Sequence, residues 1–330
     1  MGRSVPSQET MRSALALACR APSVHNSQPW RWKLAEHSVH LYLDRSRLLG
    51  VIDPTGREMV ISCGAVLNHA RIAFAGEGWQ ARVHWLPNPA QPEHLASIEF
   101  RELTEVDPHV ETLAAAAADR RSDRRPFLTD PVPQEVLAPL REVARVEDCT
   151  LTFALEDRER RELELAIEHA GSEERQRPEY REELAAWAGR HASPEGVPVR
   201  SIPAEHLRGM PERDFALAAE GELAVPILDD GAVLAVLSTR GDTYDSWLAT
   251  GEALSAVLLS ATEQGLATCP LSQIAEVAES RNLVREQILG GSGYPQMAIR
   301  IGWPVTREFP GPLTPRRPVS EFVEPLFPKE

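Results

Sequence analysis

Residues 64–78 read Gly-Ala-Val-Leu-Asn-His-Ala-Arg-Ile-Ala-Phe-Ala-Gly-Glu-Gly, and residues 251–265 read Gly-Glu-Ala-Leu-Ser-Ala-Val-Leu-Leu-Ser-Ala-Thr-Glu-Gln-Gly. Both stretches have the composition of a buried helix, and each runs between two glycines 14 positions apart. Strand-like sequence follows in both cases, so the pattern indicates an internal duplication. A second interpretation stays open, because glycine is the usual C-terminal stop of a helix and two buried helices can look alike for that reason alone.

The sequence around the first of these helices predicts a small antiparallel unit. Residues 31–34 and 39–43 alternate apolar and polar side chains as half-buried strands do, and residues 35–38 suit a hairpin turn between them. A helix predicted over 58–76 is apolar or small on more than one face, so it should lie inside the protein or at an interface. The other elements expected in this region are a helix at 8–20 and strands at 83–86 and 96–100.

Similar patterns return after residue 107. The continuous apolar run 231–238 suits a central strand, and a helix is expected over 247–264. Residues 155–215 are charged and then rich in proline, which is typical of a surface helix followed by a long irregular segment that acts as a lid or a linker. Helices are also expected at 110–119 and 134–146, and a strand at 150–154.

Composition limits the classes of function. The chain has 330 residues and a formal net charge of −14, and such an acidic surface repels phosphate backbones and anionic lipids, so we expect neither nucleic acid nor membrane as a partner. Its four cysteines lack the spacing of a zinc site or a disulfide framework, so no metal is expected and a reducing cytoplasm fits best. We find no apolar run that reaches the roughly 18 residues of a membrane helix.

An arginine cluster stands out in this acidic chain. Four arginines surround Ser122 within six residues, at positions 120, 121, 124 and 125. Guanidinium groups bind phosphate oxygens in pairs and a serine hydroxyl adds a neutral donor, so the cluster indicates a phosphate monoester. The alternative is a set of surface ion pairs with the abundant carboxylates. Neither a G-x-x-x-x-G-K-[ST] loop nor a G-x-G-x-x-G after a strand occurs, which argues against ATP hydrolysis and dinucleotide folds.

A second motif lies in the loop Pro22-Ser-Val-His-Asn-Ser-Gln-Pro-Trp30. Its two prolines restrict the backbone around a series of amides and hydroxyls, an arrangement that suits hydrogen bonding to a flat heterocycle. A plain connection between a helix and a strand is the alternative for this segment taken alone.

Together these two motifs resemble the signatures of the nitroreductase superfamily of FMN proteins. The first is Ala-Pro-Ser-x-x-Asn-x-Gln-Pro-Trp at residues 21–30, followed by a strand, and the second is Arg-Arg-Ser-x-Arg at residues 120–124. In ordinary members the Arg-Ser signature comes first, in one short chain that works as a homodimer. The reversed order in this longer chain resembles the double-length, Acg-like branch, in which two family-like halves are fused into an intramolecular pseudo-dimer.

The resemblance implies an α+β fold with mainly antiparallel sheets flanked by helices, and with the helices at 58–76 and 247–264 packed together at a pseudo-twofold axis. Residues 1–106 would form the first nitroreductase-like half, which lacks the Arg-Ser signature. Residues 107–330 would form the second half, with a lid-like insertion at about 155–215. One complete flavin site would follow rather than two, in a monomer or at most a weak homodimer.

The same resemblance assigns residues to FMN. The phosphate and ribityl side would be held by the Arg-Ser signature, that is, by Arg120, Arg121, Ser122 and Arg124. The isoalloxazine ring would face the first motif, through Pro22, Ser23 and Asn26. A backbone N–H near flavin N5 would come from the loop after Cys269, which contains Pro270, Leu271 and Ser272. The acidic residue often found in that loop is replaced by Ser272 or Gln273. The family's late basic residues near the phosphate correspond to Arg316 or Arg317.

The implied activity is that of an FMN-dependent oxidoreductase, which passes hydride from NAD(P)H to the flavin and on to a nitroaromatic or quinone-like acceptor. No catalytic side chain is demanded, because the cofactor carries the chemistry. The rival hypothesis is an FMN-sequestering protein with little or no turnover, in which the insertion closes over the flavin and keeps NAD(P)H away. A third is a phosphate-binding α/β protein of unrelated function, which would not copurify with flavin.

Overall fold

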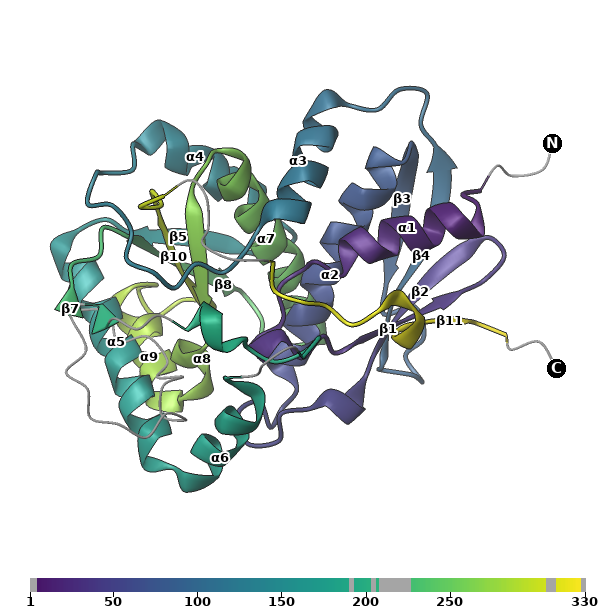
Figure 1. The fold of residues 1–330 in the computed structure, drawn as a ribbon. Coiled ribbons are helices and arrows are strands. Elements are labelled where there is room, and N and C mark those ends of the chain that lie inside the picture. Colours follow the sequence, from purple (N-terminus) through teal and green to yellow (C-terminus); the bar gives the residue numbers. More distant parts are fainter. Residues whose placement is uncertain (1–4, 190–192, 203–205, 208–226, 307–312, 328–330) are drawn as a thin grey trace.

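The computed structural model describes residues 5–189, 193–202, 206–207, 227–306 and 313–327, and it contains two main sheets (Figure 1). One has five strands in the order β11-β1-β2-β4-β3: Val323–Pro325, Trp30–Leu34, Ser38–Leu43, His94–Glu102 and Trp79–Trp85. The other has four, in the order β5-β8-β10-β9: Thr150–Ala154, Val233–Thr239, Tyr294–Gly302 and Ala267–Leu271. Two short strands, β6 (His206–Leu207) and β7 (Ile227–Leu228), form a separate parallel pair.

Every pairing within the two main sheets is antiparallel except that of β11 with β1, which is parallel. The hairpin of β1 and β2 forms where alternation predicted it, since Trp30, Trp32 and Leu34 turn into the core while Arg31 is exposed. The predicted α+β class with mainly antiparallel sheets is therefore confirmed.

The helices cover the sheets and separate them. α1 (Gln8–Ala18) begins at Ser7, whose Oγ accepts a hydrogen bond from Thr10 N at 3.0 Å. α2 (Arg57–Gly76) and α7 (Tyr244–Glu263) lie side by side between the two sheets (Figure 1). The remaining helices are α3 (Pro108–Asp119), α4 (Gln134–Val143), α5 (Asp157–Gln176), α6 (Pro178–Trp187), α8 (Gln273–Glu276) and α9 (Ala278–Gln287).

Two apolar cores lie on either side of the central helices. The first joins α1 and α2 to the five-stranded sheet, and the second joins α4 and α7 to the four-stranded sheet. Among the described residues, α2 alone is long and apolar enough to cross a membrane by length and composition, although the sequence showed us no such run. Most of this helix is buried inside the protein, as predicted, so its apolar faces are explained by packing.

α2 and α7 cross at a pair of glycines. A Cβ atom on Gly64 would lie 2.1 Å from the carbonyl oxygen of Leu248, and one on Gly251 would lie 2.0 Å from that of Ile61. Leu248 and Ile61 each stand three positions before the glycine of their own helix, so the contact is the same from both sides. Such reciprocity is the property of a twofold axis, and the two glycines are those that correspond in the repeated pattern.

The C-terminal segment crosses from one sheet to the other. After β10 in the four-stranded sheet, the chain ends with β11, where Val323 pairs with Trp32 of β1. The first sheet is thus completed by residues from the opposite end of the sequence, across the predicted boundary at residue 107.

A buried carboxyl on α7 gives the fold a measurable pH dependence. Glu252 is 1% exposed, and burial raises its pKa from 4.5 to about 7, although its Oε2 lies 3.5 Å from Nη1 of Arg71. Because the folded state binds this proton more tightly than the unfolded chain, the contribution of Glu252 to the free energy of unfolding decreases as the pH rises from about 4.5 to about 7.

We therefore expect Glu252→Gln to become progressively more stable than the wild type as the pH rises, by about 3 kcal/mol in total between pH 4.5 and 8. Urea unfolding of both proteins across that range measures the difference, in which all other titrating groups cancel. Glu111→Gln removes an exposed carboxylate and serves as the control, which should follow the wild type at every pH. A stability difference between Glu252→Gln and the wild type that stays constant with pH would contradict the raised pKa of Glu252.

Candidate active site

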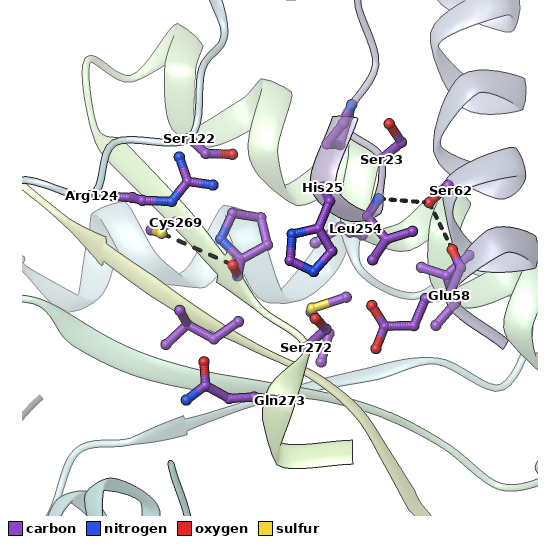
Figure 2. A pocket seen from close by; sticks show the side chains of 16 residues that line it. Ser23, His25, Glu58, Ser62, Ser122, Arg124, Leu254, Cys269, Ser272 and Gln273 are labelled. Atoms are coloured by element: carbon purple, nitrogen blue, oxygen red, sulfur yellow. Dashed lines mark hydrogen bonds between the residues drawn. The ribbon is translucent and has the colours of Figure 1, made fainter. Parts of the chain in front are cut away.

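A pocket opens where the loop after α1, the start of α2 and the end of β9 come together (Figure 2). It contains about 750 Å³ of space, part of which is open to solvent. We call it the ring pocket. Its walls are Pro22, Ser23, Val24, His25, Glu58, Ile61, Ser62, Ser122, Arg124, Leu254, Cys269, Pro270, Leu271, Ser272, Gln273 and Met297.

The loop on one side of the ring pocket has an unusual backbone. His25, Asn26 and Gln28 all have positive φ, at 46°, 56° and 51°, a conformation that is uncommon for residues other than glycine. Hydrogen bonds hold the loop in this shape, because Ser23 Oγ accepts from Gln28 N at 3.0 Å and Val24 N donates to Ser62 Oγ at 3.1 Å. The result turns the His25 imidazole into the pocket (Figure 2).

The opposite side is the end of β9. Cys269, Pro270 and Leu271 line the pocket, and α8 begins directly after them. Ser272 Oγ donates to Oε1 of Glu276 at 2.7 Å, and Gln273 Nε2 donates to the carbonyl of Ile167 on α5 at 3.3 Å. Gln273 therefore connects α8 to α5, whereas the Ser272 hydroxyl bonds within the turn of α8 itself.

A second pocket, which we call the arginine pocket, adjoins the first. Both are lined by Pro22, Ser23, His25, Ser122 and Arg124. The arginine pocket is further lined by Arg20, Asn26, Arg120, Arg121, Val197, Pro198, Ser201, Thr314 and Arg316. Among these described lining residues there are five arginines and no carboxylate.

Two of its arginines are held within the protein, Arg120 in a buried position and Arg316 in a partly buried one. Arg316 donates to five backbone carbonyls, those of Cys19, Arg20, Ala21, Thr314 and Pro315. Arg120 donates from Nη2 to Arg20 O at 3.3 Å, while its buried Nε and Nη1 have no hydrogen-bond partner. Burial first, and then repulsion from neighbouring arginines, lowers the pKa of Arg120 to about 10 and that of Arg316 to about 9. Such a cluster has the donors and the charge that suit an anion.

Most residues that the sequence singled out meet at these two pockets. Those that line one or both are Pro22, Ser23, Asn26, Arg120, Arg121, Ser122, Arg124, Pro270, Leu271, Ser272 and Arg316. Asn26 differs from the expectation in detail: it lines only the arginine pocket, and its Nδ2 donates to the carbonyls of Gly196 and Pro315.

Arg317 lines neither pocket. Its backbone N donates to Gln28 Oε1 at 2.9 Å, and its Nε donates to Glu321 Oε2 at 3.1 Å, so it fixes the C-terminal segment to the loop.

Three ionisable lining residues were missed by the sequence reasoning. Arg20 follows the end of α1, His25 lies inside the quoted loop motif, and Glu58 is in the first turn of α2. The motif gave a signal for His25, since it stands between two residues already chosen. No local sequence pattern distinguishes Arg20 or Glu58, because their places in the pockets depend on how the two sheets face each other.

The described part of the 155–215 insertion covers the arginine pocket. Ser201 accepts a hydrogen bond from Arg124 Nη1 at 3.3 Å, and Pro194 accepts one from Gln28 Nε2 at 2.8 Å. Glu195 forms an ion pair with Arg47. None of the described residues of the insertion lines the ring pocket. Residues 190–192, 203–205 and 208–226, where part of the predicted lid falls, lie outside the described residues.

Comparison with known proteins places this site in a family. A family model described as "Nitroreductase family" matches residues 117–303, which is more than half of the chain. The chain belongs to the nitroreductase family. This match includes the arginine cluster and ends after β10, so it contains the residues of the second predicted half that line the two pockets, except Thr314 and Arg316.

Relatives of this nitroreductase-family chain occur in Mycobacterium tuberculosis (strain ATCC 25618 / H37Rv). The protein named "Putative NAD(P)H nitroreductase acg" is 41% identical over 95% of this chain and 95% of its own length. Another, named "Putative NAD(P)H nitroreductase Rv3131", is 39% identical over 98% of this chain and 94% of its own. The predicted resemblance to the Acg-like branch is confirmed.

A solved structure shares the fold of this nitroreductase-family chain. The crystal structure of "a putative nitroreductase" from Anabaena variabilis aligns with a TM-score of 0.54 at 10% identity, covering 92% of this chain and 90% of that one. The similarity therefore extends over both sheets.

Proposed function

We propose that this protein is an FMN-dependent oxidoreductase that takes hydride from NAD(P)H and reduces a nitroaromatic or quinone-like acceptor. One observation carries the proposal: the buried Arg120, two of whose side-chain nitrogens have no hydrogen-bond partner, lies in a cluster of arginines directly beside the ring pocket. The phosphate of FMN would supply acceptors for Nε and Nη1 of Arg120, which have none within the protein. The names of the two mycobacterial relatives support the same activity.

The residues of the two pockets would divide between the parts of FMN. The phosphate and ribityl chain would lie in the arginine pocket, against Arg20, Arg120, Arg121, Ser122, Arg124 and Arg316. The ring would lie between the loop of Pro22 and Ser23 and the β9 end of Pro270, Leu271 and Ser272. Bound FMN supplies the hydride chemistry, and the chain positions the ring and neutralises the phosphate charge.

The described residues of the insertion would help to retain the phosphate, because Val197, Pro198 and Ser201 line the arginine pocket. None of the described insertion residues lines the ring pocket. Whether NAD(P)H reaches the ring distinguishes turnover from sequestration of FMN, and the spectroscopic experiment below measures it.

We further propose that residues 1–106 and 107–330 are two fused nitroreductase-like halves. The reciprocal contacts of Gly64 and Gly251 support this division. Both halves contribute to the one site, since Pro22 and Ser23 come from the first and the Arg-Ser signature from the second. A monomer in the cytoplasm would therefore be sufficient for activity.

The purified protein is expected to show a flavin spectrum that bleaches when NADPH or NADH is added without oxygen and returns when a nitroaromatic or a quinone follows. Anaerobic absorbance spectroscopy makes this measurement, and the rates with the two nucleotides show which donor is preferred. A flavin spectrum that persists in both nucleotides, with FMN released on denaturation, would point to sequestration instead. If the purified protein contained no flavin and bound none when FMN was added, the remaining hypothesis would be a phosphate-binding protein of unrelated function.

A further inference from the structure

The ring pocket has one acidic residue among its described walls. Glu58 lies in the first turn of α2 with a side chain that is 3% exposed, and its carboxylate is directed into the same space as the His25 imidazole (Figure 2). A buried carboxylate needs a positive partner to stay ionised. Arg57 supplies it, because its Nη2 donates to Oε1 of Glu58 at 2.9 Å.

Arg57 is itself fixed by the four-stranded sheet. Its Nη1 donates to the backbone carbonyl and to Oε1 of Gln296 on β10, at 3.0 and 3.1 Å. Gln296 in turn donates from Nε2 to Thr239 Oγ1 and to Asp242 Oδ1, at 2.8 and 3.1 Å. The carboxylate of Glu58 is therefore held by a continuous buried network and cannot turn away from the pocket without breaking it.

Arg124 and Glu58 lie at opposite ends of the ring pocket. Arg124 lines both pockets, so it stands at the junction with the arginine pocket, whereas Glu58 lines the ring pocket alone. Figure 2 shows the two side chains on either side of His25. With a phosphate on the arginines, the positive end would be neutralised, and the carboxylate of Glu58, with Arg57 behind it, would be the acidic group that faces an incoming acceptor.

We propose that Glu58 is a specificity-determining residue, which selects cationic acceptors or acceptors with hydrogen-bond donors and rejects anionic ones. This inference rests on the proposed FMN-dependent function. A fixed carboxylate at close range repels a second anion strongly in a site of low dielectric, and an acceptor that carries an amidinium, ammonium or amide group pairs with it. Arg57 acts as the positioning residue for this carboxylate.

Three redox-inert ligands of nearly equal shape test the proposal on the FMN-loaded protein: benzamidinium, benzamide and benzoate. Titrations followed by isothermal calorimetry and by the flavin absorbance give their dissociation constants. The wild type is expected to bind benzamidinium at least about tenfold more tightly than benzoate, with benzamide between them. Glu58→Gln retains an oxygen that can accept from Arg57, and it should bring the three constants to within about twofold of one another.

Glu276→Gln is the matched control, since this carboxylate receives the Ser272 hydroxyl but does not line the ring pocket. It should retain the wild-type order. Equal affinities for the three ligands in the wild type would overturn the proposal, and this measurement needs no variant. The proposal would also be overturned if Glu58→Gln kept the wild-type order of the three affinities, or if Glu276→Gln abolished that order as completely as Glu58→Gln does.

The corresponding 4-nitro compounds extend the test to turnover. The ratio of kcat/KM for 4-nitrobenzamidinium to that for 4-nitrobenzoate should fall about tenfold in Glu58→Gln, with 4-nitrobenzamide nearly unchanged. Failure of the proposed function would appear differently, as a lack of flavin or of 4-nitrobenzamide reduction in the wild type. The charge preference is read from ligand binding and does not depend on turnover.

Discussion

Replacing Arg120 with methionine is expected to weaken FMN binding about a hundredfold while leaving the flavin-free protein at least as stable as the wild type. Two side-chain nitrogens of Arg120 are buried without a partner, and charge-assisted hydrogen bonds from them to a phosphate are worth about 1.5–3 kcal/mol each. Without the phosphate, the lowered pKa of about 10 means that the buried charge costs roughly 3 kcal/mol at neutral pH. Methionine fills similar space without that cost.

Two measurements separate these effects: fluorescence titration of the flavin-free protein with FMN, and urea unfolding without FMN. Arg317→Met is the control, because Arg317 lines neither pocket and should leave the FMN dissociation constant within about twofold of the wild type. If Arg120→Met retained FMN as tightly as the wild type, the phosphate would have to lie elsewhere. The double change of Arg120 and Arg124 to alanine should strip the flavin completely while the fold remains.

Gly64→Ala is expected to destabilise the protein by about 3 kcal/mol or more, or to prevent folding, although it adds a single methyl group. That methyl would lie 2.1 Å from the carbonyl oxygen of Leu248 and 2.9 Å from the Cα atom of Gly251, and neither is a flexible side chain that can move aside. The two central helices would have to separate, and with them the two apolar cores that they join.

Gly76→Ala provides a control on the same helix. A Cβ atom there meets only the Cβ of Ala114 at 3.7 Å, an ordinary contact, so the better helix propensity of alanine should leave stability unchanged or raise it by up to about 1 kcal/mol. Urea or thermal unfolding of the two variants side by side gives the comparison. A Gly64→Ala protein as stable as Gly76→Ala would show that the helices do not meet closely at Gly64.

The sequence predicted the elements that depend on local pattern. Alternation located the hairpin of β1 and β2, the apolar run at 231–238 located β8, and the paired glycines located the two central helices. Most of the proposed site could also be named. Each of the two motifs is a single continuous stretch of sequence, and most of its predicted residues line the pockets together.

What the sequence could not predict depends on contacts between distant segments. β11 has three residues and contains Pro325, so its strand character comes only from pairing with β1. Glu58 resembles any acidic residue at the first turn of a helix until Arg57 and Gln296 are seen behind it. Arg317 was chosen with Arg316 because the two are adjacent, whereas successive side chains in an extended segment point in opposite directions.

The pairing of β11 with β1 also determines when the first sheet can be completed during synthesis of the chain. A ribosome adds about 5–20 residues per second, so β1 waits roughly 15 to 60 s after its own synthesis before residues 323–325 exist to cover its edge. During this interval the nascent chain presents an unpaired strand edge flanked by the apolar side chains of Trp30 and Trp32. Arg316, which joins the arginine pocket from the same late segment, arrives at the same time. The arginine pocket is therefore complete only after residue 316 has been synthesised, and the N-terminal sheet is the part of the fold that keeps an open edge the longest.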